Sequence, residues 1–141
     1  QIVRTNSDKV YLFVCQAESS NVLRAYWSNV TGYPTSATDF SGSAQITDTS
    51  AILSATAVYD GQSIIHVIIN NQAGVIKDYP FDLTTNTFRA SKTLSTGNPT
   101  ISGAYLGTQG VSGLYDQAGK LHVTYWGAGN QIMYAEYTYD S

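Results

Sequence analysis

Short stretches in which apolar and polar residues alternate recur along the whole chain, separated by turns rich in Gly, Asn and Asp. They cover residues 10–14, 23–29, 54–58, 65–69, 76–82, 110–114, 121–126 and 135–140. Alternation with a period of two is typical of β-strands, and no stretch of ten residues shows convincing helical periodicity. The pattern therefore predicts an all-β protein with almost no helix.

Several of these stretches form a unit that occurs twice and, more faintly, a third time. One copy begins at Tyr59-Asp60 and contains His66, and the other begins at Tyr115-Asp116 and contains His122. In the faint N-terminal copy, Tyr11 takes the place of the His. A period of roughly 50 residues is typical of propellers and other repeat arrays.

Each unit reads as three strands joined by tight turns, which is an antiparallel meander. We expect one domain over 1–141, with repeats at approximately 1–50, 51–108 and 109–141. One meander has two open edges and too small a core, so it needs neighbours. We predict a β-propeller built of antiparallel meander blades, about three per chain; the alternative is a two-sheet antiparallel sandwich. Residues 32–50 should be a loop with one short strand, and 88–94 an outer strand.

Each clear unit carries a His in its second strand and an acid in its third, which suggests a repeated polar site. The pairs are His66 with Asp78 and His122 with Glu136, and strand alternation places Trp126 on the same face as His122. Sugars present hydroxyl groups to polar side chains and C–H faces to aromatic rings, so this combination suits a carbohydrate. The alternative is that His and acid only bond each other across the strand pair.

Two segments resemble the third-strand signature of the fungal fucose-specific lectins, which are six-bladed β-propellers. The segments are Ile76–Asp82 and Ala135–Asp140, against a family pattern of roughly Ile-x-Glu-Tyr-x-Trp-Asp. The resemblance implies that a second-strand basic residue and a third-strand acid hold the sugar while an aromatic ring stacks on it. Those positions are carbohydrate-binding candidates here: His66, Asp78, His122 and Glu136, with Trp126, Trp27 and Arg24.

The family's second-strand Arg is replaced by His in both units. A neutral His offers one donor and one acceptor in place of a planar, charged fork. Arg24 keeps a guanidinium, but on the third strand of its unit. We therefore expect polar binding of a sugar without specifying fucose. Trp27 and Trp126 can belong either to the site or to the core.

The repetition of the site favours binding over catalysis. A catalytic centre is usually single, whereas repeated weak sites gain avidity. The sequence contains only two Glu, Glu18 and Glu136, and shows no nucleophile elbow, phosphate loop or metal-ligand cluster. We expect a non-catalytic, multivalent lectin without a cofactor. A propeller-fold glycoside hydrolase and a non-binding structural or adhesion protein are the alternatives.

Composition narrows the possible partners. The chain is 43% hydrophobic but only 12% charged, with a net charge of −3 and no basic patch, which argues against nucleic-acid binding. No apolar run approaches the ~20 residues of a membrane-spanning helix. The partners we expect are glycans of glycoproteins or glycolipids, together with a second copy, because six units from two chains would complete a propeller.

The single cysteine, Cys15, excludes an internal disulfide and reads as a small buried hydrophobe. The numbered chain starts at Gln1 rather than Met, and Asn29-Val30-Thr31 is a glycosylation sequon. Together these features favour a secreted protein.

Overall fold

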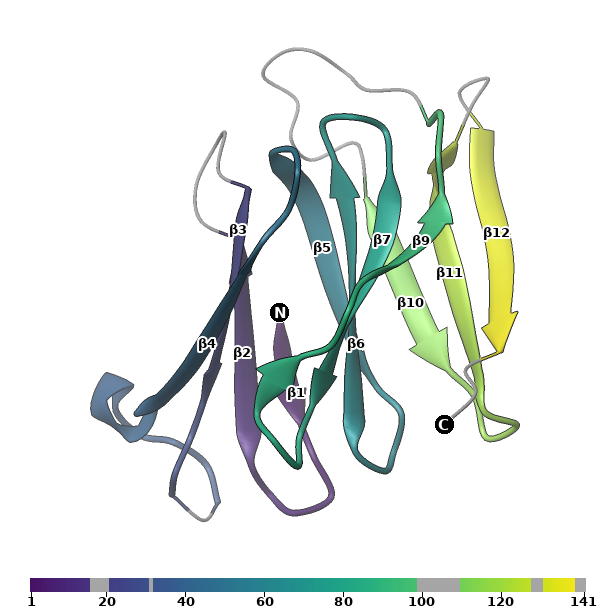
Figure 1. Ribbon diagram of the computed structural model, residues 1–141. Coiled ribbons are helices and arrows are strands. Elements are labelled where there is room, and N and C mark those ends of the chain that lie inside the picture. Colours follow the sequence, from purple (N-terminus) through teal and green to yellow (C-terminus); the bar gives the residue numbers. More distant parts are fainter. Residues whose placement is uncertain (16–20, 31, 99–109, 128–130, 139–141) are drawn as a thin grey trace.

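The computed structural model describes residues 1–15, 21–30, 32–98, 110–127 and 131–138. Within these ranges the chain forms twelve β-strands and one short 3₁₀ helix, Ala37–Asp39. The all-β prediction is confirmed. All strand pairs are antiparallel, and they form three separate sheets (Figure 1).

The first sheet has the order β1-β2-β3-β4. Its strands are β1 (Ile2–Arg4), β2 (Val10–Cys15), β3 (Val22–Trp27) and β4 (Gly42–Thr47). The middle sheet has the order β5-β6-β7-β8, and β9 also pairs with β7. Its strands are β5 (Ile52–Tyr59), β6 (Ile64–Asn71), β7 (Ile76–Asp82), β8 (Thr87–Phe88) and β9 (Lys92–Ser95). The last sheet, in the order β10-β11-β12, consists of β10 (Val111–Tyr115), β11 (Lys120–Gly127) and β12 (Gln131–Thr138).

One of two expectations about the connections needs correction. The segment 32–50, predicted to be a loop with one short strand, contains the six-residue strand β4, whose residues 43–47 alternate between polar and apolar. The single outer strand predicted over 88–94 is divided into β8 and β9, both of which pair with β7.

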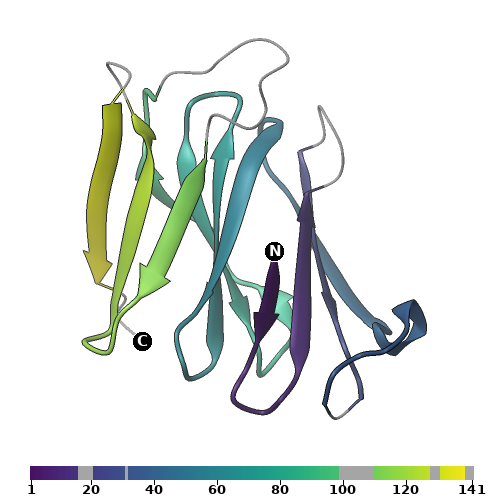
Figure 2. The ribbon, with the colours of Figure 1, turned by 180° about the vertical axis from the view of Figure 1, so that it is seen from behind.

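The three sheets pack face to face, and the middle sheet is covered on both sides. Ile65, Val67 and Ile69 of β6 belong to the core shared with the first sheet. Ile68, between them in sequence, belongs to a second core shared with the last sheet. Because successive side chains of a strand point to opposite faces, this near-continuous apolar run buries both faces of the sheet. In the view from behind, the opening strands β1, β5 and β10 lie next to one another (Figure 2).

The layers resemble those of a sandwich, although the described residues form three sheets rather than two. None of the three sheets closes on itself, and over the described ranges the sheets do not complete a ring. Among those residues, no helix is long and apolar enough to cross a membrane.

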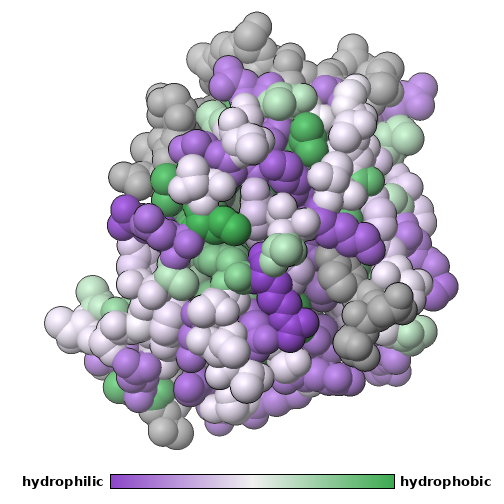
Figure 3. Space-filling model, viewed as in Figure 1, coloured by the Kyte–Doolittle hydropathy of each residue, from purple (hydrophilic) through white to green (hydrophobic). Residues whose placement is uncertain are grey.

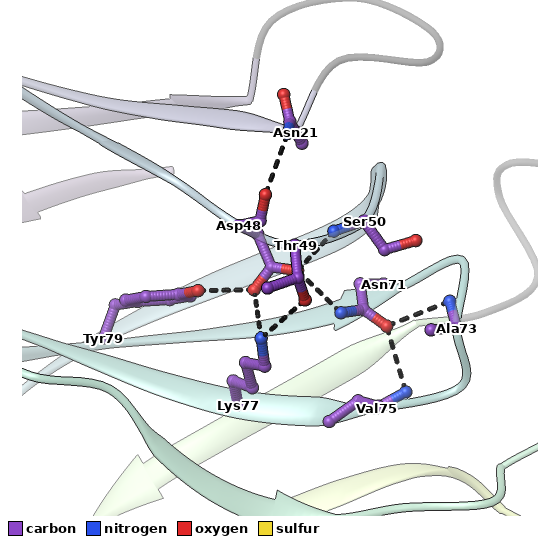
Figure 4. A network of polar contacts seen from close by, with 9 residues as sticks. All are labelled: Asn21, Asp48, Thr49, Ser50, Asn71, Ala73, Val75, Lys77 and Tyr79. Atoms are coloured by element: carbon purple, nitrogen blue, oxygen red, sulfur yellow. Dashed lines mark hydrogen bonds and ion pairs between the residues drawn. The ribbon is translucent and has the colours of Figure 1, made fainter.

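A buried carboxylate, Asp48, ties the end of the first sheet to the middle sheet (Figure 4). Its oxygens accept hydrogen bonds from Asn71 Nδ2 and Lys77 Nζ, both at 2.7 Å, and from the hydroxyl of Tyr79. Burial by itself raises the pKa of the Asp48 carboxyl, but the bonds from Lys77, Tyr79 and Asn71 together bring that pKa below its ordinary value. The network therefore stabilises an ionised Asp48 at the junction of two sheets.

Candidate functional site

A cleft of about 430 Å³ lies between the β5–β6 turn of the middle sheet and the β10–β11 turn of the last sheet. Most of its walls are polar. Its lining residues are Asp60, Gln62, Ser63, Ile64, His66, Arg89, Tyr115, Asp116, Gln117, Ala118, Gly119 and Thr138. Of the seven residues predicted from sequence, His66 alone is in this lining set.

His66 forms the buried part of the cleft wall. Its Nδ1 lies 2.8 Å from Asp78 Oδ2, and the two side chains are 2% and 0% exposed. The imidazole stacks on the ring of Tyr115, with centroids 5.4 Å apart and planes 10° from parallel. The predicted cross-strand polar pair therefore exists, but it lies between two sheets. Asp78 does not face solvent.

Burial also governs the charge of Asp78. Desolvation raises the pKa of its carboxyl, and the hydrogen bond with His66 and the nearby charge of Lys92 act in the opposite direction. A buried carboxylate without a close donor would be strongly unfavourable, so His66 supports Asp78 in this position.

The two turns that form the walls are built alike. Asp60 Oδ1 accepts hydrogen bonds from the backbone N–H groups of Gln62, Ser63 and Ile64 at 2.7–3.1 Å. Asp116 Oδ1 accepts two such bonds, from Ala118 and Lys120, each at 2.9 Å. This is the Asx chemistry that the sequence pattern predicted. Both carboxylates thus hold the shape of the cleft.

Arg89 brings a guanidinium to the cleft from the short segment between β8 and β9. Its Nε and Nη2 donate to Asp82 Oδ2 at 3.1 and 2.7 Å, and its side chain is 53% exposed. The ion pair lowers the pKa of the Asp82 carboxyl. Sequence analysis missed Arg89 because it lies outside the repeated His and acid pattern. Tyr115 was noticed only as the marker that opens a unit.

His122 has different surroundings from His66. It lies on the outer face of the last sheet, where its Nδ1 contacts the hydroxyl of Tyr134 at 2.6 Å and its Nε2 contacts Asp116 Oδ2 at 2.9 Å. Glu136 Oε2 is 3.9 Å from Nδ1 and Glu136 also pairs with Lys120. Hydrogen bonding to His122 is the main reason that the pKa of Asp116 is lowered.

The expected equivalence of Asp78 and Glu136 is wrong. His66 lies opposite Pro80, whereas His122 lies opposite Glu136. Both partners are 14 positions after their His, so Glu136 corresponds to Pro80. The residue that corresponds to Asp78, 12 positions after its His, is Tyr134. The similar acid-Tyr patterns are offset by two positions, which keeps the same face and concealed the difference.

The remaining predicted residues are dispersed. Trp27 packs in the first core, with its ring centroid 5.9 Å from that of Phe81. Trp126 shares the outer face of the last sheet with His122, since both positions alternate to the same side of β11. Arg24 lies on the outer face of the first sheet beside Tyr26 and Gln45. The structure therefore does not gather the seven candidates into one site.

Within the described parts of the chain, no group of three or more His, Cys, Asp or Glu side chains could hold a metal ion. The chain matches no model of a known protein family, and no curated protein matches it significantly.

Proposed function

We propose that this protein is a non-catalytic carbohydrate-binding lectin and that the cleft between the middle and last sheets is its sugar site. The observation that supports this proposal is the composition of the cleft. Guanidinium, amide and hydroxyl groups surround one aromatic ring at the junction of two sheets. Sugars require this mixture of directional polar groups and one apolar ring surface.

The polar groups come from three separate segments. The half-exposed guanidinium of Arg89, already aligned by Asp82, can donate to a sugar hydroxyl. The side-chain amides of Gln62 and Gln117 come from the two opposing turns, and each can donate and accept. Because Asx hydrogen bonds hold both turns, the site is largely preformed, which reduces the entropy lost on binding.

The acids of the cleft favour binding over hydrolysis. A glycoside hydrolase needs a carboxylic acid with a raised pKa beside the scissile bond. The pKa of Asp116 is lowered instead, chiefly by His122, and Asp60 is occupied by three turn amides. Asp78 has a raised pKa but is fully buried. This arrangement supports a non-catalytic role.

We further propose that the three sheets are consecutive blades of a β-propeller. In support, each sheet is a meander, and the opening strands of neighbouring sheets are in contact.

The face of the molecule seen in Figure 3 is mostly hydrophilic to neutral, with small hydrophobic areas. Such a surface suits glycans of glycoproteins or glycolipids as partners at an extracellular location.

A glycan array followed by calorimetry with the best ligand tests the sugar proposal. Arg89→Ala should weaken binding by about tenfold or more, the range expected for losing a hydrogen bond to a charged group. Lys9→Ala is the control, because Lys9 is an exposed cation on the β1–β2 turn of the first sheet and does not line the cleft. It should bind as the wild type does. Circular dichroism of both variants checks the fold.

The outcomes separate the function classes. Failure of every glycan to bind, or an Arg89→Ala variant with wild-type affinity, would refute a sugar site in this cleft. Turnover of chromogenic glycosides would favour a hydrolase, and silence in both assays would favour a structural or adhesion role.

A further inference from the structure

Equivalent faces of the three sheets point in the same direction, each toward the next sheet along the chain. Tyr11, His66 and His122 occupy the same place in their sheets, since each lies two positions after the residue that closes the first turn. The Tyr11 face of the first sheet packs on the middle sheet, and the His66 face of the middle sheet packs on the last sheet. The His122 face of the last sheet points outward.

The opposite face of each sheet points toward the preceding sheet. Tyr59 and Tyr115 end the opening strands of the middle and last sheets, and each packs toward the preceding sheet. In the first sheet the corresponding residue is Arg4, because it pairs with Val10 as Tyr115 pairs with Leu121. Arg4 and its neighbour on that face, Ile2, point outward.

Both outward faces expose large apolar side chains. On the last sheet, Ile132, Leu114 and Tyr134 are 77%, 63% and 60% exposed. On the first sheet, Ile2 is 73% exposed and Val14 is 38% exposed. Exposed apolar groups clustered on a sheet face indicate an interaction surface.

We propose that a second copy of this chain packs the outer face of its first sheet on the outer face of the last sheet, and that its Arg4 completes a polar site around His122. Each copy has one face of either kind, so two copies related by a twofold axis can make the contact twice.

Charge and register agree on where Arg4 would lie. Tyr115 stacks on His66 at the existing junction, so Arg4 of the second copy should lie over His122. His122 is flanked there by two carboxylates, Asp116 at 2.9 Å and Glu136 at 3.9 Å. In one copy, Arg4 contacts only surface groups among the described residues, Asp8 at 2.5 Å and the Tyr33 hydroxyl at 2.9 Å. Replacing these surface contacts of Arg4 by contacts with the two carboxylates beside His122 would strengthen its electrostatic interactions.

Two covered hydrogen-bond donors lie on these same faces. The Nε1 of Trp126 and the Nε of Arg24 are buried and have no acceptor within the described part of the chain. Trp126 belongs to the outer face of the last sheet and Arg24 to that of the first. Buried donors are nearly always satisfied in a finished interface, so these two faces are where acceptors are expected.

The ligand chemistry of the completed site rests on the proposed function. His122, Tyr134 and Glu136 of one copy with Arg4 of the other would form a polar junction like the first cleft, suited to a hydroxylated ligand. The association itself does not depend on that ligand.

Sedimentation velocity over a concentration series tests the contact with the sugar-free chain. A 15.2 kDa chain should sediment as a dimer. Arg4→Glu and Glu136→Arg should each weaken association by at least tenfold. The double variant, which restores opposite charges, should recover most of the loss. Lys9→Glu makes the same charge change outside the face and should leave the dimer intact.

A chain that stays monomeric up to about 100 μM, a concentration well above the Kd of a specific interface, would overturn the proposal. The proposal would also be overturned if the double variant associates no better than the single variants although all three variants retain the circular dichroism spectrum of the wild type. A dimer that binds no glycan would support this contact while refuting the lectin proposal.

Discussion

At the scale of single residues, buried charge is stabilised where sheets meet. Asp48 is 2% exposed, yet its carboxyl is ionised because Asn71, Lys77 and Tyr79 all donate to it. Burial and the neighbouring carboxylate together raise the pKa of the Tyr79 hydroxyl, which therefore remains a donor. Each of these groups depends on the others, so the network should respond strongly to a single change.

Asp48→Asn should lower the free energy of unfolding by about 3 kcal/mol, because it leaves Lys77 without its ion-pair partner in a largely buried position. Urea denaturation at pH 7 measures this loss. Asp8→Asn is the control, since Asp8 is an exposed acid and Asn tolerates its left-handed backbone. An Asp48→Asn protein as stable as the control would show that the network contributes little.

The same carboxylate predicts a pH dependence. The pKa of Asp48 is lower in the folded than in the unfolded chain, so its contribution is present above the unfolded pKa of about 3.9. The contribution is lost as the pH falls below that value through the folded pKa. We expect the stability difference between wild type and Asp48→Asn to shrink between pH 5 and pH 2. A difference that stays constant across this range would contradict the assignment.

At the scale of elements, the approach of β10 to the middle sheet depends on a residue without a side chain. A Cβ on Gly113 would lie 2.7 Å from Ile68 Cδ1 and 2.9 Å from Val58 Cγ2. Val58 is β-branched and has little rotamer freedom, and Ile68 is fully buried. The last sheet can therefore seat closely on the middle sheet only because this position is Gly.

Gly113→Ala should lower the free energy of unfolding by about 1–2 kcal/mol, as expected for overpacking a well-filled junction. Gly110→Ala is the matched control, because a Cβ at Gly110 meets no atom within 4 Å. Thermal unfolding of the two variants compares them directly. Equal melting temperatures would mean that the junction has spare volume.

At the scale of the whole molecule, the three packed sheets place the strand that is best protected from solvent in the middle sheet. β6 is paired on both sides and buried on both faces, whereas β12 is an edge strand with mostly exposed side chains. Local stability should therefore fall from the middle sheet toward β12.

Native-state hydrogen exchange at low protein concentration, where the chain is monomeric, measures this gradient. Amides of β6 should exchange with free energies near the global value, and those of β12 with clearly smaller values. Comparable protection in β6 and β12 would contradict the layered account of stability.

The agreement between sequence and structure depends on how local each feature is. The turn at Asp116 could be predicted because its carboxylate bonds amides within four residues of itself. The short strand expected within 32–50 is β4, because its residues alternate polar and apolar over 43–47. The correspondence of Asp78 with Glu136 failed because a two-residue offset preserves the face of a strand, so only the cross-strand register distinguishes the two alignments.

The site shows the same limit. The local sequences around His66 and His122 share only the dipeptide His-Val. His66 lies in a near-continuous apolar run over 64–69 and is 1% exposed beneath Tyr115, whereas His122 lies in an alternating strand and faces outward. Arg89 enters the cleft from a segment that carries no repeat signal. The apolar run around His66 indicates burial on both faces of its strand, but it does not indicate which sheet covers this His.

By itself, the sequence determined the all-β class, the strands of the repeated units and the Asp turns that join them, because alternation and turn chemistry act over a few residues. Tertiary structure decided which sheet covers each buried face, and that Arg89 and Tyr115 share a cleft. These features arise from contacts between sheets that are distant in the chain. Their energies depend on packing and desolvation, which no short stretch of sequence specifies.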